Sequence, residues 1–270
     1  DDDAGILTNM DLAAHAARAT STLEIVLTHG AGVLAPVTAA RQIAALDAAS
    51  GGRLVLRIVA DGALASAEAR DRPASHAAAL ARLDEYLVLL KRLWSNEAPF
   101  EHQGPFYSVR EGHVAAKGPQ GAALPIRMGG LSGTAIRIAA RHADVFELEP
   151  GSPEEVRLLV GRVAEAAREF GRSERIRFAL PVAFDAPSPA GAARGVQLAG
   201  SPAQIALALL PYAAIGITEF VVSGVTSPRD IALFGEQTGP LLRNSIRRRI
   251  APEPVAPPLV FAPPALARRN

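Results

Sequence analysis

Short apolar segments alternate with longer segments of helical periodicity along almost the whole chain. The short segments are rich in Val, Ile and Leu, and the one at 53–60 is apolar enough to suit burial on both faces. The long segments repeat their apolar positions every three or four residues, most regularly over 75–95. This alternation of strands and helices is typical of a parallel sheet covered by helices, so the pattern predicts an α/β protein.

Seven strand–helix units can be counted in this pattern. The expected strands are 5–8, 23–28, 53–60, 125–128, 144–148, 176–184 and 218–223, and the expected helices are 11–20, 36–49, 75–95, 132–142, 153–170, 202–214 and 228–242. We expect Asp11 as the N-cap of the first helix and Pro36 in the first turn of the second. A small hairpin excursion at about 98–112, centred on Gly104-Pro105, interrupts the alternation, and a Pro/Gly-rich link is expected over 187–200.

Seven units fit either an open sheet or a (β/α)8 barrel that lacks its first unit. The length of 270 residues favours the barrel, which typically takes about 250 residues. We therefore expect one (β/α)8 TIM barrel domain over 1–250, with its first strand–helix unit missing from the numbered chain. The last twenty residues hold six prolines, which predicts an extended arm over 251–270.

Composition and charge exclude several classes of protein. With 49% hydrophobic and 20% charged residues, the chain can bury a large core and is neither disordered nor collagen-like. The net charge of +1, without a basic stripe before the carboxyl terminus, predicts no nucleic-acid partner. The absence of cysteine excludes disulfides, thiolate zinc sites and a cysteine nucleophile. No apolar run reaches the ~20 residues of a membrane span and no signal peptide is read, so we expect a cytoplasmic protein.

In a barrel, the reactive groups lie where strands end and the following loops begin. The segment Gly129-Gly130-Leu131-Ser132 lies between a strand and a helix. Glycines let the backbone approach an anion closely, and a helix N-terminus offers free amides. This segment predicts either a phosphate site or an ordinary structural turn. His29 and Asp61 also follow strands and are candidate pocket residues, whereas no spacing of His, Asp or Glu indicates a metal site.

A second glycine-rich segment, from Gly30 to Ala35, matches the G-x-G-x-x-A fingerprint of dinucleotide-binding proteins. Two features count against that function. Pro36 suggests that the helix begins after the glycines rather than at them, and Asp61 lies 31 positions past Gly30, whereas the acidic residue of the fingerprint is expected about 20 residues on. An NAD(P)-dependent oxidoreductase is therefore kept only as the weaker alternative.

Several segments taken together resemble a known family. They are APVTAARQIAALD (35–47), SGGR (50–53), FEHQG (100–104), PIRMGGLS (125–132), FGR (170–172), GSP (200–202), YAAIGI (212–217) and FVVSG (220–224). This set, with the Pro-rich arm, resembles the bacterial-luciferase-like flavin monooxygenases, most closely the reduced-FMN-dependent alkanesulfonate monooxygenases. The resemblance covers nearly the whole chain and implies a (β/α)8 barrel in which the seven units are strands two to eight.

The resemblance also implies a mechanism and partners. Reduced FMN, delivered by a separate NAD(P)H:FMN reductase, would react with O2 to give a flavin hydroperoxide that oxygenates a small organic substrate. The family's phosphate loop matches Gly129, Gly130, Leu131 and Ser132, with Leu131 where a serine is usual. His76 matches the histidine that precedes an Arg-Tyr pair early in the family's long helix, and it is assigned to cofactor binding. We also expect a homodimer or homotetramer.

The assigned catalytic candidates are His29, Asp61 and Arg194. His29 would act as a proton donor or hydroperoxide stabiliser, Asp61 would lie near the isoalloxazine, and Arg194 is the only lid-like arginine of a shortened link.

The chain departs from the family at several site positions. Leu180-Pro181-Val182-Ala183 stand where the sulfonate enzymes place an Arg and a His, and Ala79-Leu80 stand where they have an Arg-Tyr pair. The family's cysteine is absent, a tyrosine is replaced by Val225, and a tryptophan is replaced near Glu149. A pocket without these cations binds an anion poorly, because a desolvated unpaired charge is costly. We therefore expect a substrate less anionic than an alkanesulfonate. A barrel that binds flavin or a protein partner without catalysis is the alternative.

Overall fold

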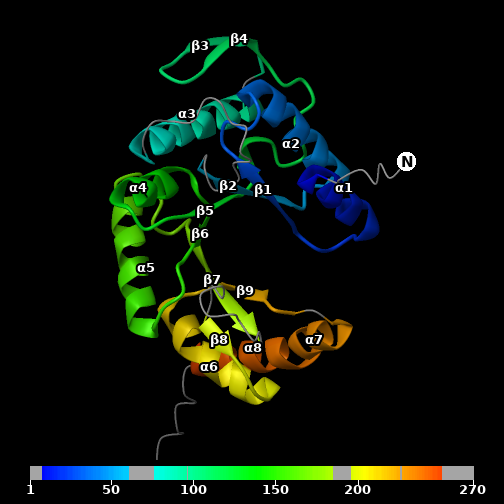
Figure 1. Ribbon diagram of the computed structural model, residues 1–270, viewed down its shortest axis with the longest axis vertical. Coiled ribbons are helices and arrows are strands. Elements are labelled where there is room, and N and C mark those ends of the chain that lie inside the picture. The colour runs from blue at the N-terminus through cyan, green and yellow to red at the C-terminus, as the bar shows by residue number, and fades with distance from the viewer. Residues whose placement is uncertain (1–7, 61–75, 96, 185–195, 226, 251–270) are drawn as a thin grey trace, which may run out of the picture.

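The computed structural model describes residues 8–60, 76–95, 97–184, 196–225 and 227–250 (Figure 1). The helices are α1 (Asn9–Ala19), α2 (Pro36–Ser50), α3 (His76–Ser95), α4 (Gly133–His142), α5 (Pro153–Arg168), α6 (Pro202–Ile215), α7 (Pro228–Ala232) and α8 (Gly239–Ile250), with a 3-10 turn at Gly121–Ala123 and a π-helical segment at Leu233–Thr238. The strands are β1 (Ile25–Gly30), β2 (Leu54–Val59), β3 (Phe100–Gln103), β4 (Ser108–Gly112), β5 (Ile126–Gly129), β6 (Val145–Glu147), β7 (Arg177–Phe184), β8 (Val196–Leu198) and β9 (Glu219–Ser223).

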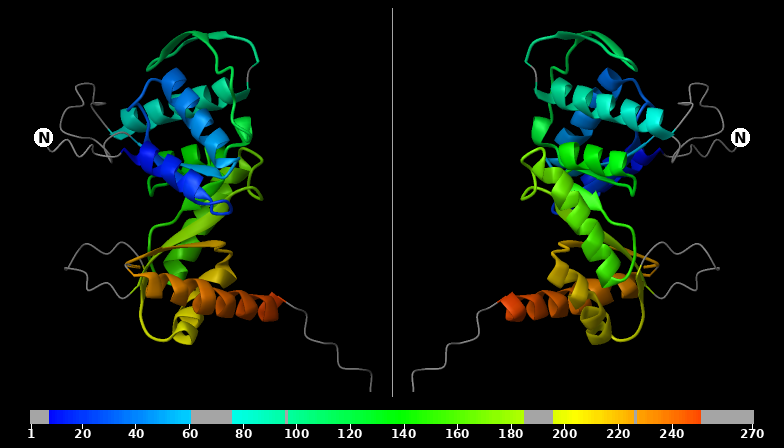
Figure 2. Two further views of the ribbon diagram at one scale, coloured as in Figure 1. Left: turned by 90° about the vertical axis from the view of Figure 1, so that its right-hand side faces the viewer. Right: turned by 90° about the vertical axis from the view of Figure 1, so that its left-hand side faces the viewer.

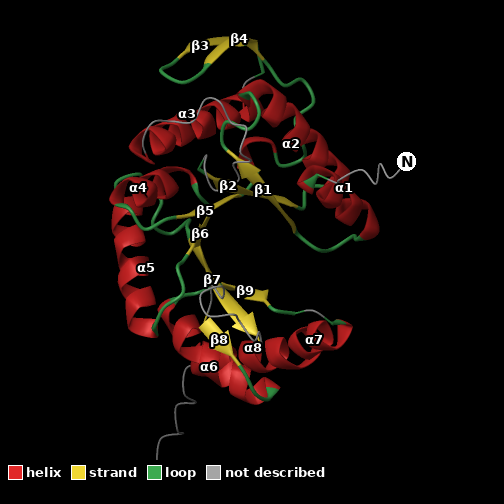
Figure 3. Ribbon diagram, viewed as in Figure 1, coloured by secondary structure: helices red, strands yellow, loops and turns green. Residues whose placement is uncertain are grey.

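Seven of the described strands form one parallel sheet. Its order is β1-β2-β5-β6-β7, and both β8 and β9 pair with β7. The helices follow the outside of this curved sheet, from α2 and α3 through α4 and α5 to α6 and α8 (Figures 1 and 3). The predicted α/β class is confirmed. The described strands do not close into a ring, since β1 pairs only with β2 and β9 only with β7.

The two faces of the sheet differ in chemistry. Side chains alternate along a strand, and residues in register on neighbouring parallel strands point to the same side. On β2, Leu54, Leu56 and Ile58 belong to the hydrophobic core under the helices. The opposite face, here called the inner face, carries Arg57 of β2 and the residues in register with it. The prediction that this strand is apolar on both faces is therefore wrong at Arg57.

The predicted N-cap of α1 is also wrong. Thr8 caps the helix, and Asp11 is the third helical residue. The Thr8 hydroxyl accepts a hydrogen bond from the Asp11 amide at 3.2 Å, and the Asp11 carboxylate accepts from the Thr8 amide at 3.1 Å. In a capping box the acidic residue stands three positions after the N-cap, so the N-cap lies three residues before the acidic residue that we predicted for it. The expected first strand, 5–8, lies almost entirely outside the described residues.

Two departures concern the carboxyl-terminal part. Within the expected Pro/Gly-rich link, residues 196–198 form β8, a strand too short for periodicity to reveal. The expected single helix over 228–242 is α7, a π-helical segment and α8, and it continues to residue 250. α2 begins at Pro36, as the sequence predicts, and its C-cap is Gly51, whose φ of 67° is left-handed.

The predicted hairpin is confirmed as β3 and β4. One carboxylate on α3 holds it: Glu85 accepts hydrogen bonds from the amides of Phe106 at 3.0 Å and Tyr107 at 3.1 Å, and pairs with His102 Nε2 at 2.8 Å. In the side views the hairpin lies at one end of the molecule and α6 to α8 lie at the other (Figure 2). The hairpin is thus an attachment to α3 and takes no part in the parallel sheet.

Candidate functional site

The turn after β5 needs its two glycines for packing. Gly130 has a φ of 144°, and a Cβ there would lie 2.7 Å from the Cβ of Ala135. A Cβ on Gly129 would collide with the carbonyl oxygen of Glu147 on the neighbouring strand. The chain can therefore pass directly from the end of β5 into the first turn of α4.

α4 presents its N-terminus at this turn. Ser132 is the N-cap, and its hydroxyl oxygen accepts from the amide of Ala135 at 3.2 Å. The amides of Gly133 and Thr134, the first two helical residues, have no acceptor within the helix. Both residues are exposed, and a Cβ on Gly133 would meet open space. Two free N–H groups and the positive end of the helix dipole thus lie together, an arrangement that suits an anion.

A cavity of about 260 Å³ lies at the carboxyl ends of β2, β5, β6 and β7, and we call it the mouth cavity. Its polar lining consists of Arg57, Glu147 and Glu149, together with the backbone of Gly129 and Gly130. The remaining described lining is apolar: Ile58, Val59, Ala60, Leu80, Leu83, Met128, Leu148, Pro150 and Pro181. This is the edge of the sheet where a barrel places its reactive groups.

Five charged side chains on the inner face form a connected chain, here called the inner-face network. Arg57 Nε lies 2.7 and 2.9 Å from the two carboxylate oxygens of Glu147. Arg127 lies 3.8 Å from Glu147 and pairs closely with Glu219. Arg177 then pairs with the other oxygen of Glu219 at 3.0 Å. Charges of alternating sign thus link β2, β6, β5, β9 and β7 across the sheet.

Burial within the network is uneven. The Arg127 side chain is only 8% exposed and its Nε has no partner among the described residues, whereas the Arg57 and Arg177 side chains are 40% and 48% exposed. The sequence analysis assigned none of the five residues to the site, although Glu147 lies at a strand end, where we expected the pocket. The signal that could have found them is a lone charged residue inside each of several apolar strands, as at Arg57 and Arg127.

His29, at the end of β1, is buried against α3. Its Nε2 lies 2.8 Å from the Tyr86 hydroxyl, which donates to the carbonyl of Leu34 at 3.2 Å. Because the hydroxyl has one proton, it accepts from His29, and this requires a proton on Nε2 and leaves Nδ1 as an acceptor. Burial lowers the pKa of His29, so the neutral form persists at pH 7. Its assignment as a catalytic residue stays a prediction.

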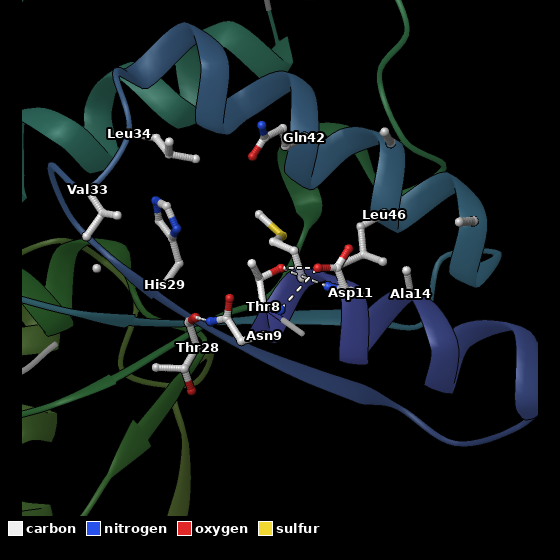
Figure 4. A pocket seen from close by; sticks show the side chains of 14 residues that line it. Thr8, Asn9, Asp11, Ala14, Thr28, His29, Val33, Leu34, Gln42 and Leu46 are labelled. Atoms are coloured by element: carbon white, nitrogen blue, oxygen red, sulfur yellow. Dashed lines mark hydrogen bonds between the residues drawn. The ribbon is translucent and has the colours of Figure 1, made fainter. Parts of the chain in front are cut away.

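His29 lines a second cavity, of about 830 Å³, between α1, β1 and α2 (Figure 4). We call it the α1–α2 cavity. The His29 ring lies at the edge of this space, and Gln42 and Leu46 of α2 line it from the opposite side. Where α1 and β1 line the cavity, the Asn9 side chain donates a hydrogen bond to the carbonyl oxygen of Thr28. The volume is in the range of small-molecule pockets, roughly 300–1,000 Å³.

The structure brings together only part of the predicted site. Gly129 and Gly130 line the mouth cavity, whereas His29 lines the α1–α2 cavity. Leu131 is exposed, and Ser132 caps α4. His76 is the exposed first residue of α3. The two remaining candidates, Asp61 and Arg194, lie outside the described residues.

At the opposite, amino-terminal end of the strands, His142 has a structural role. It is buried, with Nε2 2.7 Å from an oxygen of Asp84, and its carbonyl accepts from Lys91 at 2.9 Å. Burial lowers the pKa of His142 to about 4. The neutral ring therefore links α3 to α4, at the face of a barrel that serves stability rather than catalysis.

Within the part of the chain that the structure describes, no three His, Asp or Glu side chains gather as metal ligands would. None of the described helices combines the length and apolarity needed to span a membrane.

The family model for luciferase-like monooxygenases matches residues 2–194. The fold is similar to that of long-chain alkane monooxygenase, with 18% identity over 90% of this chain and 74% of that one and a TM-score of 0.77. It is similar to EDTA monooxygenase from Chelativorans sp. BNC1, with 19% identity over 88% and 77% of the two chains and a TM-score of 0.76. It is also similar to coenzyme F420 dependent tetrahydromethanopterin reductase from Methanopyrus kandleri, with 19% identity over 87% of each chain and a TM-score of 0.72. The predicted barrel-type fold is thereby confirmed.

Proposed function

The chain belongs to the luciferase-like monooxygenase family, and from this premise we propose that it uses reduced FMN and O2 to oxygenate a small organic substrate. The substrate is not a simple alkanesulfonate, because the mouth cavity has no cation without a carboxylate partner among the described residues. The proposal includes a separate NAD(P)H:FMN reductase that supplies the reduced cofactor, and assembly as a homodimer or homotetramer.

The observation that carries this proposal is the glycine turn that leads into α4 beside the mouth cavity. The amides of Gly133 and Thr134 and the hydroxyl of Ser132 fit a phosphate dianion, since each can donate a hydrogen bond to it. Gly129 and Gly130 line the cavity and begin the turn that leads to this anion site at the N-terminus of α4. The residues present thus fit the phosphate end of FMN.

A reduced flavin, when bound, supplies the electrons that activate O2 for transfer of one oxygen atom to the substrate. The protein's own contribution is to position both molecules and to exclude water. Leu80, Leu83 and Met128 give the mouth cavity an apolar wall. His29, neutral and with Nδ1 as an acceptor, is retained as a candidate proton-transfer residue, and Asp61 and Arg194 are retained from the sequence analysis.

Matched variants at Gly133 test the phosphate site. Gly133 is the first residue of α4, and Ser132 has an extended backbone with a φ of −70° and a ψ of 149°. Proline is well tolerated at this helical position and after such a residue. Gly133→Pro and Gly133→Ala both place a Cβ in open space, but only proline removes the N–H donor.

We expect Gly133→Pro to weaken FMN binding by about 10- to 100-fold, the loss of one hydrogen bond to a charged group. Gly133→Ala should bind FMN like the parent protein, and riboflavin, which lacks the phosphate, should bind both variants equally. Flavin fluorescence titration measures the affinity of the parent and of each variant for both flavins. Equal FMN affinity in the two variants would place the phosphate elsewhere.

A second cofactor is favoured by a specific finding: a similar structure is F420-dependent. Anaerobic titration with reduced FMN and with F420, followed by 18O2, separates the alternatives. Incorporation of one 18O atom into a product supports the monooxygenase. Binding of F420 alone would indicate a dehydrogenase or reductase, and binding of neither cofactor would favour a barrel that has lost catalysis.

A further inference from the structure

Arg57 is the only Lys, Arg or His among the described residues that line the mouth cavity. Its hydrogen bonds use Nε alone, which faces both carboxylate oxygens of Glu147. The two terminal nitrogens have no partner within the described part of the chain, and the side chain is half-exposed. The cavity therefore contains guanidinium N–H groups that a bound molecule can reach.

The charge of Arg57 is already balanced. Glu147 lies in direct contact with it, and the next cation, Arg127, which does not line the cavity, pairs with Glu219, an anion that it shares with Arg177. Glu149 adds an exposed carboxylate to the same cavity. Since Glu149 is exposed and contributes little, the charge that a bound anion would meet is that of the neutral pair, and the anion would lose its hydration without an unpaired cation in return.

An uncharged hydrogen-bond acceptor fits this arrangement better. A carbonyl or amide oxygen can accept from the terminal N–H groups of Arg57 without disturbing the ion pair. A hydrocarbon would cover the same N–H groups and leave them unpaired, which is unfavourable. The polar group of a bound molecule that suits this cavity is therefore uncharged and accepts hydrogen bonds.

We propose that Glu147 is a specificity-determining residue: by neutralising Arg57, it makes the mouth cavity select substrates whose polar group is an uncharged carbonyl or amide. The inference rests on the proposed function in that the molecule bound there is the substrate. Arg57 donates the hydrogen bond, and Glu147 sets the charge that the substrate meets.

Benzamide and benzoate form a suitable pair of probes, because they have nearly the same shape and differ in charge. Binding of each to the purified full chain is measured by ligand-observed NMR titration. The parent protein should prefer benzamide by about tenfold or more, which corresponds to one charge-assisted hydrogen bond. Glu147→Gln unpairs Arg57 and should reverse the preference toward benzoate by a similar factor.

Glu149→Gln is the matched control, because it removes the same charge from the same cavity without touching Arg57. We expect its preference to stay within about twofold of the parent, since an exposed charge without a close partner contributes little. If Glu147→Gln does not fold, Arg57→Met serves instead and should lose benzamide affinity by about tenfold.

Preference of the parent protein for benzoate, binding of neither probe, or an equal change in the two Gln variants would overturn the inference. The assay contains no flavin, so its outcome is separate from that of the cofactor titration. A protein that binds reduced FMN but prefers benzoate would retain the proposed function and refute this specificity.

Discussion

Within the inner-face network, we expect Arg127 and Glu219 to contribute unequally to the free energy of unfolding. Arg127→Met removes the middle arginine, yet Glu147 keeps Arg57 and Glu219 keeps Arg177. Glu219→Gln leaves Arg127 with only the 3.8 Å approach to Glu147, although the Arg127 side chain is almost fully buried. Arg127→Met thus leaves each remaining charge with a close partner, whereas Glu219→Gln leaves the buried charge of Arg127 without one.

The magnitudes follow from burial. Breaking a buried ion pair so that one charge loses its partner costs about 3–5 kcal/mol. The Glu219 side chain is 24% exposed, so the lower end applies and we expect Glu219→Gln to cost about 3 kcal/mol. Arg177 also loses its partner, but it is half-exposed and contributes little. Arg127→Met fills similar space and removes an unpartnered buried Nε, so we expect about 1 kcal/mol or less, of either sign.

Urea unfolding followed by circular dichroism gives both free energies of unfolding. Glu154→Gln is the control, because it changes the same side chain in an exposed pair with Arg157, which should contribute at most about 0.5 kcal/mol. A larger loss for Arg127→Met than for Glu219→Gln would refute the alternating order of charges on which the reasoning rests.

Three further predictions concern pH, backbone and helix capping. The pKa of His142 is lowered to about 4, so as the pH falls the ring takes up a proton in the unfolded chain before it does so in the folded one. The free energy of unfolding should therefore fall by about 2 kcal/mol between pH 7 and pH 5. Urea titrations at the two pH values measure this loss, which should be smaller in His142→Gln. Gly130→Ala combines a φ of 144° with a contact of 2.7 Å to Ala135, so it should lower the unfolding midpoint; an unchanged midpoint would contradict the packing role of this glycine. Ser132→Ala should cost about 1 kcal/mol, whereas Ser132→Thr, which keeps the hydroxyl, should cost less.

The periodicity of the sequence predicts the sheet and the long helices well. α2 and α3 are found almost as expected, since Pro36 and Gly51 delimit the first and a regular apolar stripe marks the second. Errors arise where a local pattern has two solutions. Thr8 and Asp11 both suit a helix start, and the geometry of the capping box decides between them.

The candidate site was predicted less completely, for a reason that lies in register. Arg57 and Glu147 are 90 residues apart, and each looks like an isolated charge in an apolar strand. Only the pairing of β2 with β5 and of β5 with β6 places them on one face. The glycine turn was found because its signal is local, whereas the direction of the His29 ring depends on Tyr86 of α3, which the strand pattern does not reveal.

The alternating charges of the inner face also constrain how this protein can be redesigned. Any single substitution at Arg57 or Glu147 passes through a state with one unmatched charge, which costs stability before a new specificity is gained. Libraries that vary these two codons jointly avoid that barrier, whereas Arg127 can be varied alone because Glu219 keeps Arg177 as its partner. Among natural relatives that share the network, the same logic predicts that Arg57 and Glu147 change together rather than one at a time.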